Sequence, residues 1–536
     1  EWNTFLNTRK DGDYSVARNG WLADYNDPIC FLDMWVTASG NNDVQFGKGA
    51  HANLKMYDLD LTKWGYETKV EDGTWAETYD VLISTIKSCT DTAKRYELMH
   101  LAEDILMSTG CIVPLYYYTD LYMIDDKVEG FFSNPLGYKY FMYTTVDGAT
   151  EAINVCLASE PDTLDPALNS AVDGATMLSH LFSGLAKWAQ GEDGKLVIVP
   201  DCAVELPEGV VNEDGTVTYT YTLKDGLKWS NGDALTAADF VNAWQRAASP
   251  ALGADYGYMF EVVKGYAEMW ETNDAGEFVN PDAKLAVEAV DEKTIKITLA
   301  NAVSYWNELL AFPTYFPVHS SALENESWAT EAATYICNGA YTIESWTHES
   351  LITLAKNASY HGAADVTMNK INCYLSDDAN NMLANFRKGD WALIDDVPTN
   401  EIATLKTEFP EEFVIAGQIG TYYVCWNVNE KIYNPENTTL TAEELEAIQA
   451  EIRSALGLLF DRNYIVEEIS QAGEIPASSF VAMGMTNPDG TEFYKTANGG
   501  ASVNGYDGYY DVSKEAFKTN VDKALEILGK YYNLAK

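Results

Sequence analysis

The sequence is poor in basic residues: 35 Lys and Arg stand against 81 Asp and Glu, which gives a formal net charge of −46 at pH 7. Binding to nucleic acid requires a basic surface that displaces counterions from phosphates, so nucleic acid is excluded as a partner. The excess of carboxylates predicts a solubilising, self-repelling surface. The sequence also lacks any run of about 18 apolar residues that could form a membrane-spanning helix.

Cysteine and histidine are scarce as well. The eight cysteines include no C-x-x-C pair or other short spacing that marks a zinc site or a redox motif. A chain of this length does not need disulfides to stabilise its core, so we expect mostly free, buried thiols. The six histidines are scattered without helical i, i+3 or i+4 pairing, and we therefore expect no metal site.

Motifs of nucleotide-binding and hydrolytic enzymes are missing too. There is no G-x-x-x-x-G-K-[ST], no G-x-G-x-x-G after a strand, no H-E-x-x-H and no G-x-S-x-G. We expect a protein without enzymatic activity and without a cofactor. One enzymatic alternative stays open, because two of the many carboxylates could serve a glycan-active hydrolase, with tyrosines and tryptophans stacking on sugars.

The sequence is rich in aromatic residues, with 34 Tyr, 19 Phe and 14 Trp, and is 47% hydrophobic, which predicts a globular protein. Its 536 residues predict three or four domains or large lobes. Strand and helix patterns alternate along the whole chain and no repeat of fixed length occurs. The fold class is therefore α/β or α+β.

Apolar periodicity predicts a helix over residues 80–109, ended by Gly110, and then a short buried strand over 112–118. Turn residues at 146–150, followed by an apolar strand from Ile153, indicate a junction.

Residues alternate with period two over 217–223 and on both sides of a turn at 291–293, which predicts hairpins. Thr236 and Thr441, each followed three residues later by an acidic residue, predict the starts of helices. A further helix is expected from near Ser513 to Leu528.

The segment Val16–Pro28, VARNGWLADYNDP, combines a basic residue, a tryptophan and a carboxylate at close spacing, which is typical of a binding cleft rather than a core. A second segment, LKDGLKWSNGDALTAADFV at 223–241, resembles the signature of the oligopeptide- and dipeptide-binding proteins of bacterial ABC importers, the extracellular solute-binding proteins of family 5. Shorter matches to this family lie at 160–166, 338–341, 386–390, 453 and 461–462. The resemblance covers nearly the whole chain.

The order of the matching segments differs from the family. The stretch that begins at Glu160 lies near the mature N-terminus of family members, whereas residues 20–25 and 114–118 match segments near their C-terminus. The sequence therefore resembles a circularly permuted member with its seam at 146–150, a rearrangement that adjacent termini permit. A strand and a helix of the family, about 40 residues, have no counterpart between residues 536 and 1.

The resemblance implies a fold like that of type II periplasmic binding proteins, a Venus flytrap of two large lobes with mixed sheets and a third, smaller lobe. The first lobe would hold residues 1–117 with 425–536, the second would hold 118–195 with 318–424, and the small lobe would hold 196–317. The lobes would close on a short peptide, and the difference in affinity between the open and closed states would drive closure.

The same resemblance implies a monomeric receptor outside the cytoplasm, in the periplasm or on the outer face of the cell membrane as a lipoprotein. It would deliver peptides to the membrane subunits of an ABC importer. Relatives that bind nickel complexes, haem or oligosaccharides keep other solutes open as ligands.

Individual site residues follow from the resemblance. Asp24 would pair with the α-ammonium of the peptide, because a buried ammonium without a partner is costly, although Asp24 could instead hold a turn. Arg18 would receive a carboxylate, or else form an internal salt bridge. Leu22 is a further expected ligand-binding residue; it stands where a disulfide cysteine can occur in the family, with Gly420 opposite it. Aromatic side chains would form the pocket walls: Trp2, Trp21, Tyr256, Tyr258 and Tyr422.

Overall fold

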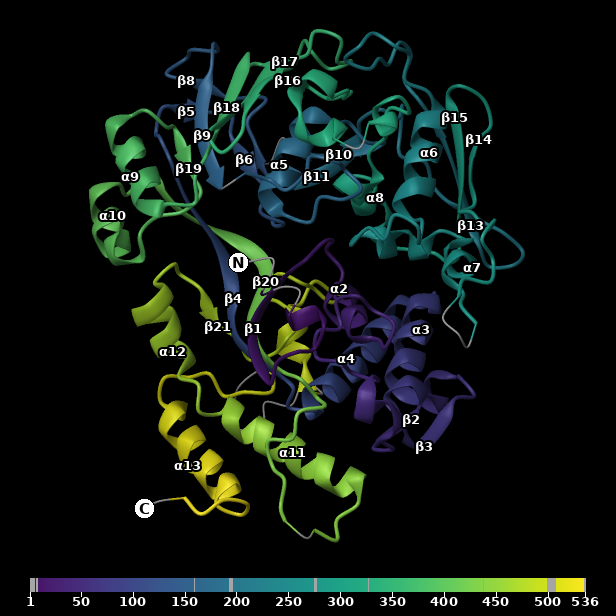
Figure 1. Ribbon diagram of the computed structural model, residues 1–536, viewed down its shortest axis with the longest axis vertical. Helices are drawn as coiled ribbons and strands as arrows, with labels where there is room; N and C mark the ends of the chain where they lie inside the picture. The colour runs from purple at the N-terminus through teal and green to yellow at the C-terminus, as the bar shows by residue number, and fades with distance from the viewer. Residues whose placement is uncertain are drawn as a thin grey trace. The chain divides into compact units, whose positions relative to one another are not determined.

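The computed structural model describes residues 5, 8–158, 160–191, 196–273, 277–325, 327–436, 438–498 and 508–534. The chain forms two compact units, one of residues 1–119 with 417–536 and one of residues 120–416. The first unit therefore combines both end regions of the sequence (Figure 1). Strands β4 (Ile112–Ile124) and β20 (Phe413–Trp426) run from one unit into the other.

The first unit is built on a small sheet with helices around it. In sheet order its strands are β1 (Val16–Leu22), β20 and β4, and β21 (Ile475–Pro476) pairs with β4. A separate hairpin joins β2 (Tyr57–Asp60) and β3 (Lys69–Gly73). The helices are α2 (Ile29–Leu32), α3 (Val81–Ser88), α4 (Thr92–Ser108), α11 (Ala442–Gly457), α12 (Arg462–Tyr464) and α13 (Ala516–Leu528).

The second unit is a mixed sheet with helices and a separate four-stranded sheet. The main order is β4, β19 (Leu393–Ile394), β9 (Ile153–Ala158), β18 (Lys370–Leu375), β17 (Leu351–Lys356) and β16 (Tyr341–Thr347), in which β9 is parallel to both β18 and β19. The four-stranded sheet has the order β12 (Val210–Val211), β13 (Val217–Thr222), β15 (Thr294–Leu299) and β14 (Val287–Ala289).

Short pairs of strands and six helices complete this unit within its described residues. The pairs are β5 (Val128–Glu129) with β8 (Thr145–Val146), β6 (Phe132–Ser133) with β7 (Lys139–Tyr140), and β10 (Ala186–Gln190) with β11 (Leu196–Pro200). The helices are α5 (Val172–Leu181), α6 (Ala237–Ala247), α7 (Tyr266–Trp270), α8 (Trp306–Leu309), α9 (Ala379–Lys388) and α10 (Ile402–Glu408).

Local sequence signals explain most element boundaries. The capping boxes at Thr236 and Thr441 are both formed, and they start α6 and α11 as predicted. The expected turn is present, with Asp147 and Gly148 in the left-handed region (φ 52° and 74°), and β9 starts at Ile153. The hairpin predicted at 291–293 joins β14 to β15.

The prediction of one helix over 80–109 is wrong. The structure has two helices, α3 and α4, because the backbone is extended at Cys89 and Asp91 caps the start of α4 by accepting a hydrogen bond from the Lys94 N–H. The strand that follows, β4, runs to Ile124 and is longer than predicted.

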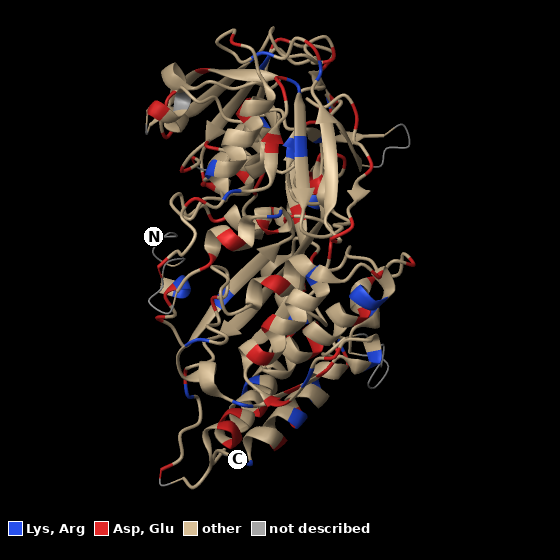
Figure 2. Ribbon diagram, turned by 90° about the vertical axis from the view of Figure 1, so that its right-hand side faces the viewer, with Lys and Arg blue, Asp and Glu red and all other residues tan. Residues whose placement is uncertain are grey.

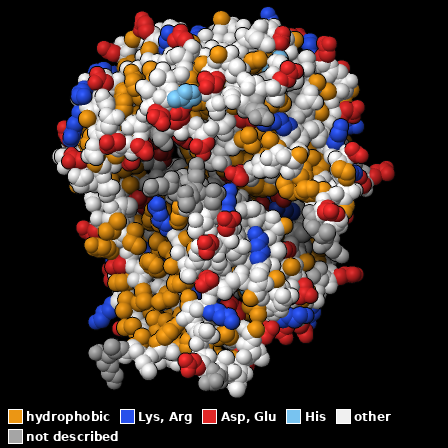
Figure 3. Space-filling model, in the orientation of Figure 1, with side chains coloured by type: hydrophobic (Ala, Val, Ile, Leu, Met, Phe, Trp, Pro, Cys, Tyr) orange, Lys and Arg blue, Asp and Glu red, His pale blue; other side chains and the backbone are white. Residues whose placement is uncertain are grey.

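All eight cysteines are buried as free thiols. None of the helices in the described ranges is both long and apolar enough to cross a lipid bilayer. Acidic residues are spread along the helices and loops of both units, where basic residues are fewer (Figure 2). On the face seen in Figure 3, exposed apolar side chains lie between the charged ones.

Candidate functional site

Strand β1, which carries most of the predicted binding segment, lies at the end of the sheet in the first unit. It pairs antiparallel with β20, so that Gly20 lies opposite Tyr422 and Leu22 opposite Gly420, as expected for the last pair. No other strand of the described ranges pairs with β1. The side of β1 that faces away from β20 therefore has no strand partner within the described ranges, and the Arg18 carbonyl on that side accepts a hydrogen bond from Arg9 at 3.4 Å.

Three tyrosines cover one face of this sheet. The rings of Tyr116 on β4 and Tyr422 on β20 stack with centroids 4.8 Å apart, and Tyr118 meets them edge-on at 5.7 and 6.1 Å. All three are half-buried. Because side chains alternate along a strand, Arg18 and Leu22 lie on this same face. We call these five residues the tyrosine face.

Two glycines make room for the tyrosine face. A Cβ atom on Gly20 would lie 2.1 Å from the hydroxyl oxygen of Tyr118. A Cβ atom on Gly420 would lie 2.4 Å from Cδ2 of Leu22 and 2.8 Å from Cδ2 of Tyr118. Any larger residue at either position would displace the Tyr118 ring, so the glycines of both strands are needed for close approach of this ring to the sheet.

The tyrosine face combines neutral phenols with one cation. Arg18 is exposed and hydrogen bonds the side chain of Tyr422, which raises the pKa of the guanidinium above its ordinary value. Burial raises the pKa of Tyr116 and Tyr118 well above the usual range of a phenol. Near neutral pH the face therefore offers flat apolar rings, hydroxyl groups and a positive charge.

Asp24 and Asp27 follow β1 and have different surroundings. Both are buried. Asp27 receives two hydrogen bonds from Arg95, at 2.7 and 2.9 Å, and a third from the Ile29 N–H. The Asp24 N–H donates to Sγ of Cys30, and burial together with the negative charge of Asp24 raises the pKa of that thiol. Asp27 is thus the carboxylate that holds the turn before α2.

The other predicted residues are not all brought together. Trp21 lies on the opposite face of β1 from Arg18, and its indole N–H donates to the Cys30 carbonyl at 2.9 Å. Tyr256 and Tyr258 belong to the second unit, half-buried with ring centroids 6.3 Å apart, and Phe312 packs edge-on against Tyr256. Trp2 lies outside the described residues.

Tyr116 and Tyr118 were missed by the sequence reasoning. The run Pro114–Tyr118 was recognised as a strand, and its period of two places positions 116 and 118 on one face. Nothing in three consecutive tyrosines shows which face is buried. Tyr117 points to the other side, is fully buried and hydrogen bonds Ser479.

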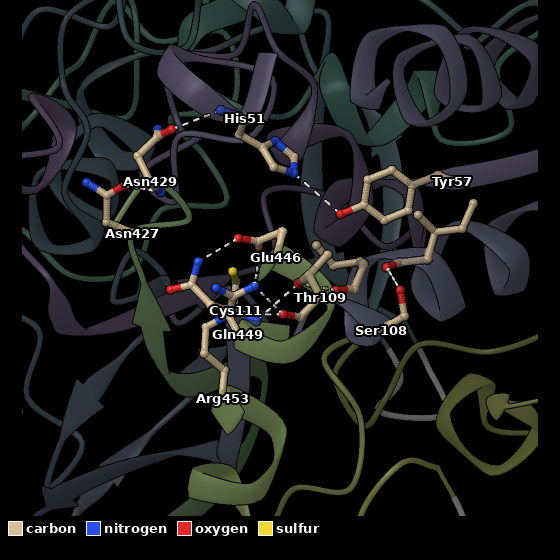
Figure 4. Close-up of polar contacts among 12 residues, drawn as sticks. His51, Tyr57, Ser108, Thr109, Cys111, Asn427, Asn429, Glu446, Gln449 and Arg453 are labelled. Atoms are coloured by element: carbon tan, nitrogen blue, oxygen red, sulfur yellow. Dashed lines mark hydrogen bonds and ion pairs between the residues drawn. The ribbon is translucent and has the colours of Figure 1, made fainter. Parts of the chain in front are cut away.

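A second polar cluster in the first unit is structural (Figure 4). Arg453 of α11 is buried, forms an ion pair with Glu446 and donates to the Thr109 carbonyl at the end of α4. Burial lowers the pKa of His51 in the same region to about 4, so this ring is neutral at physiological pH. Arg453, Glu446 and Thr109 are buried, and their contacts join the end of α4 to α11.

Within the described parts of the chain, no cluster of three or more His, Cys, Asp or Glu side chains is placed to hold a metal ion. The tyrosine face, the outer edge of β1 and Asp24 offer aromatic, main-chain and charged groups that are suited to noncovalent binding of an organic molecule.

Residues 197–530 match the family described as bacterial extracellular solute-binding proteins, family 5 Middle. The oligopeptide-binding protein OppA of Bacillus subtilis is 33% identical over 341 residues, which cover 61% of this chain and 56% of that protein. The dipeptide-binding protein DppE of the same organism is 27% identical, over 62% of this chain and 56% of that protein. The chain thus spans little more than half the length of these relatives.

A third relative, 29% identical over 58% of this chain and 53% of its own length, is the probable deoxycholate-binding periplasmic protein YgiS of Escherichia coli. Among solved structures, OppA of Burkholderia pseudomallei has a TM-score of 0.54 at 24% identity, over 71% of this chain and 67% of that one. The substrate-binding domain of an oligopeptide ABC transporter from Bacillus anthracis has a TM-score of 0.52 at 25% identity, with the same two coverages. The fold is a mixed α/β fold like that of the OppA structures.

Proposed function

Because the chain belongs to the bacterial extracellular solute-binding proteins of family 5, we propose that it captures short peptides and delivers them to the membrane subunits of an ABC importer. The names of OppA and DppE, which describe oligopeptide and dipeptide binding, support this proposal. It acts by binding alone, outside the cytoplasm.

The observation that carries the proposal is the outer edge of β1, with which no strand of the described ranges pairs. The Ala23 N–H donates to the Ile419 carbonyl, whereas the Gly20 N–H donates to the side chain of Asn19. The backbone N–H and C=O groups of odd-numbered residues therefore point towards β20, and those of even-numbered residues point away from it. An extended peptide can add to this edge as a further strand, bound through its main chain. Such binding is tolerant of peptide sequence.

The ends of the peptide would meet charges at the two ends of β1. In this proposal Asp24, buried just after the strand, pairs with the α-ammonium, because a buried ammonium needs an anionic partner. Arg18, exposed near the start of the strand, receives the carboxylate. Six further residues are proposed to contact ligand side chains: Trp2, Trp21, Leu22, Tyr256, Tyr258 and Tyr422.

We propose the finer architecture as well: three lobes with the bounds predicted from the sequence and a circularly permuted order with its seam at 146–150. Two features support the permuted order. The first unit is assembled from both end regions of the chain, and the family match starts only at residue 197. A reordered chain, with residues 148–536 placed before 1–147 through a flexible linker, should keep the fold and ligand affinity. A reordered chain that does not fold would contradict the seam.

Native mass spectrometry of the purified protein tests the proposed function. We expect co-purified masses of short peptides, and a thermal shift when a peptide library is added after their removal. A protein that purifies without bound peptide and shows no shift with the library would contradict the proposal. A shift with a bile acid such as deoxycholate, but not with peptides, would favour the alternative that YgiS suggests.

A further inference from the structure

The outer edge of β1 does not offer all of its main-chain groups to a ligand. From the end of the strand backwards, the residues whose N–H and C=O groups point away from β20 include Leu22, Gly20 and Arg18. Among the described residues, none hydrogen bonds the N–H or the carbonyl of Leu22, or the carbonyl of Gly20. These three groups can therefore pair with an added strand.

The next groups along the edge are already hydrogen bonded. The Gly20 N–H donates to Oδ1 of Asn19 at 2.7 Å. The Arg18 carbonyl accepts from Nη1 of Arg9 at 3.4 Å. Asn19 and Arg9 are both buried, and Asp43 holds both, accepting from Nε of Arg9 at 2.6 Å and from Nδ2 of Asn19 at 3.2 Å. Two side chains fixed by one carboxylate thus end the row of pairing groups at Gly20.

An aromatic ring also lies beside the first half of β1. The centroid of the Phe5 ring is 5.3 Å from the guanidinium carbon of Arg9 and 5.7 Å from that of Arg18. Cation–π contacts of this kind stabilise the position of the ring. The part of the chain that precedes β1 is therefore packed against the same end of the strand at which the pairing groups are occupied.

A peptide in the proposed orientation, with its α-ammonium near Asp24, would run antiparallel to β1. Its first residue would lie opposite Leu22 and exchange both main-chain hydrogen bonds with it, and its third residue would donate its N–H to the Gly20 carbonyl. The groups of its second residue would point away from β1. The third carbonyl and the fifth N–H would meet groups that Asn19 and Arg9 already occupy.

The guanidinium of Arg18 is held where such a peptide would end after three residues. It hydrogen bonds the side chain of Tyr422, and Tyr422 is the residue that pairs with Gly20. The third residue of the peptide would lie opposite Gly20 on the other side of β1. Its carboxylate would therefore be at the level of this guanidinium, which suits a charge-assisted hydrogen bond.

We infer that β1 pairs with three residues of a peptide and no more, that Asn19 and Arg9 set this limit, and that the protein prefers tripeptides. The inference rests on the proposed function, because it takes the ligand to be a peptide added to the outer edge of β1. Longer peptides bind through their first three residues and gain no further main-chain hydrogen bond from this strand.

Calorimetry with alanine peptides of two to five residues, all with free termini, tests the limit. From two residues to three, affinity should rise roughly three- to tenfold, because a main-chain hydrogen bond to the Gly20 carbonyl is added. The peptides of four and five residues should bind no more than about twofold more tightly than the tripeptide, since β1 offers them no additional group.

The variant Asn19→Ala tests the side chain that occupies the Gly20 N–H. Without the Asn19 amide, this N–H can donate to the third residue of the peptide, and the ratio of tripeptide to dipeptide affinity should rise by roughly a further three- to tenfold. Loss of the hydrogen bond to Asp43 can lower the folded fraction, but a ratio measured within one protein does not depend on that fraction.

The matched control is Asn463→Ala, which removes a side-chain amide of α12 that donates to the Val512 carbonyl. It should keep the wild-type ratio. An unchanged ratio in Asn19→Ala, the same change in the control, or a continued rise in affinity from three to five residues would overturn the three-residue limit and leave the proposed function intact. Failure of every peptide to bind would instead overturn the proposed function.

Discussion

Tyr422 and Tyr423 are neighbours on β20, yet they lie on opposite faces of the sheet in different surroundings. Tyr423 is fully buried, with its ring 6.0 Å from that of Trp35 and 5.1 Å from that of Phe480. Tyr422 is half-buried, stacks on Tyr116 and hydrogen bonds Arg18. One face of the sheet packs the core of the first unit, and the other leaves aromatic and charged groups within reach of a ligand.

This difference separates stability from binding. We call the buried face of the sheet, where Tyr423 packs against Trp35 and Phe480, the Tyr423 face. Substitution of a large side chain on this face by a small one should lower the free energy of unfolding, because it leaves a cavity in a close-packed core. Substitutions on the tyrosine face should mainly lower ligand affinity, since these side chains keep part of their surface in solvent. The following predictions are ordered from the largest expected effect to the smallest.

The largest effect should come from Trp35→Ala. Trp35 is fully buried, and its ring meets those of Phe46, Tyr423 and Phe480. Removal of the indole should cost the first unit about 3–5 kcal/mol. Urea unfolding followed by circular dichroism measures this loss; a change below about 1 kcal/mol would show that the Tyr423 face is not the stabilising face.

Asp24→Asn should weaken binding of a peptide with a free N-terminus by roughly 2–5 kcal/mol, because a buried ammonium loses its partner. Acetylation of the peptide should weaken binding to the wild type by a similar amount and leave binding to the variant unchanged. Calorimetry measures all four combinations. An equal effect of acetylation on both proteins would remove Asp24 from the site.

Asp27→Asn is the matched control for Asp24. The amide keeps one acceptor oxygen but removes the negative charge and the second acceptor of the partly buried Arg95, so the unfolding midpoint should fall. A variant that unfolds like the wild type but no longer binds peptide would place Asp27, rather than Asp24, at the ligand.

Glu103 should make the free energy of unfolding of the first unit depend on pH. It is fully buried beneath the loop that carries Phe480, accepts hydrogen bonds from the N–H groups of Phe480 and Val481, and has its pKa raised by burial to about 8. The folded state thus retains a proton that the unfolded state releases near pH 4.5. Its contribution to stability is complete below that pH and is lost as the pH rises towards 8.

Glu103→Gln should remove this dependence. Between pH 5 and pH 9 the unfolding free energy of the wild type should fall relative to that of the variant by roughly 2–4 kcal/mol. Chemical unfolding at the two pH values measures the difference. Parallel pH profiles would show that Glu103 has an ordinary pKa.

The smallest and most selective effects concern the neighbouring tyrosines. Tyr422→Ala should weaken peptide binding about tenfold through loss of ring contacts, and change the unfolding free energy by less than about 1.5 kcal/mol. Tyr423→Phe should leave affinity unchanged and stability equal or slightly higher, because its buried hydroxyl has no hydrogen-bond partner within the described structure. A loss of affinity in Tyr423→Phe together with unchanged affinity in Tyr422→Ala would show that the ligand binds on the side of Tyr423.

Sequence patterns predicted the positions of helices and strands better than they predicted which side chains meet on one face of the sheet. The capping boxes at Thr236 and Thr441 were sufficient to locate two helices, because both partners of each box are local. The break between α3 and α4 was missed because apolar periodicity continues across it, and only the cap at Asp91 marks it.

The candidate site was predicted only in part. The register that places Leu22 opposite Gly420 was anticipated, whereas the association of Arg18 with Tyr116 and Tyr118 depends on the pairing of β1 with β20 and of β20 with β4, strands some 400 and 300 residues apart in the chain. The space for Tyr118 depends on Gly20 and Gly420 together, and single-sequence patterns do not show which glycine meets which ring.

Hydrogen exchange at β1 tests the central claim most directly, because the claim is that a peptide adds to the outer edge of this strand. The amide of Leu22 faces outward by the alternation of the strand, whereas that of Ala23 is bonded to Ile419. Addition of a tight-binding peptide should slow exchange at Leu22 at least tenfold and change exchange at Ala23 much less, since a new hydrogen bond protects only the outward amide. Unchanged exchange at Leu22 in the saturated complex would contradict the account.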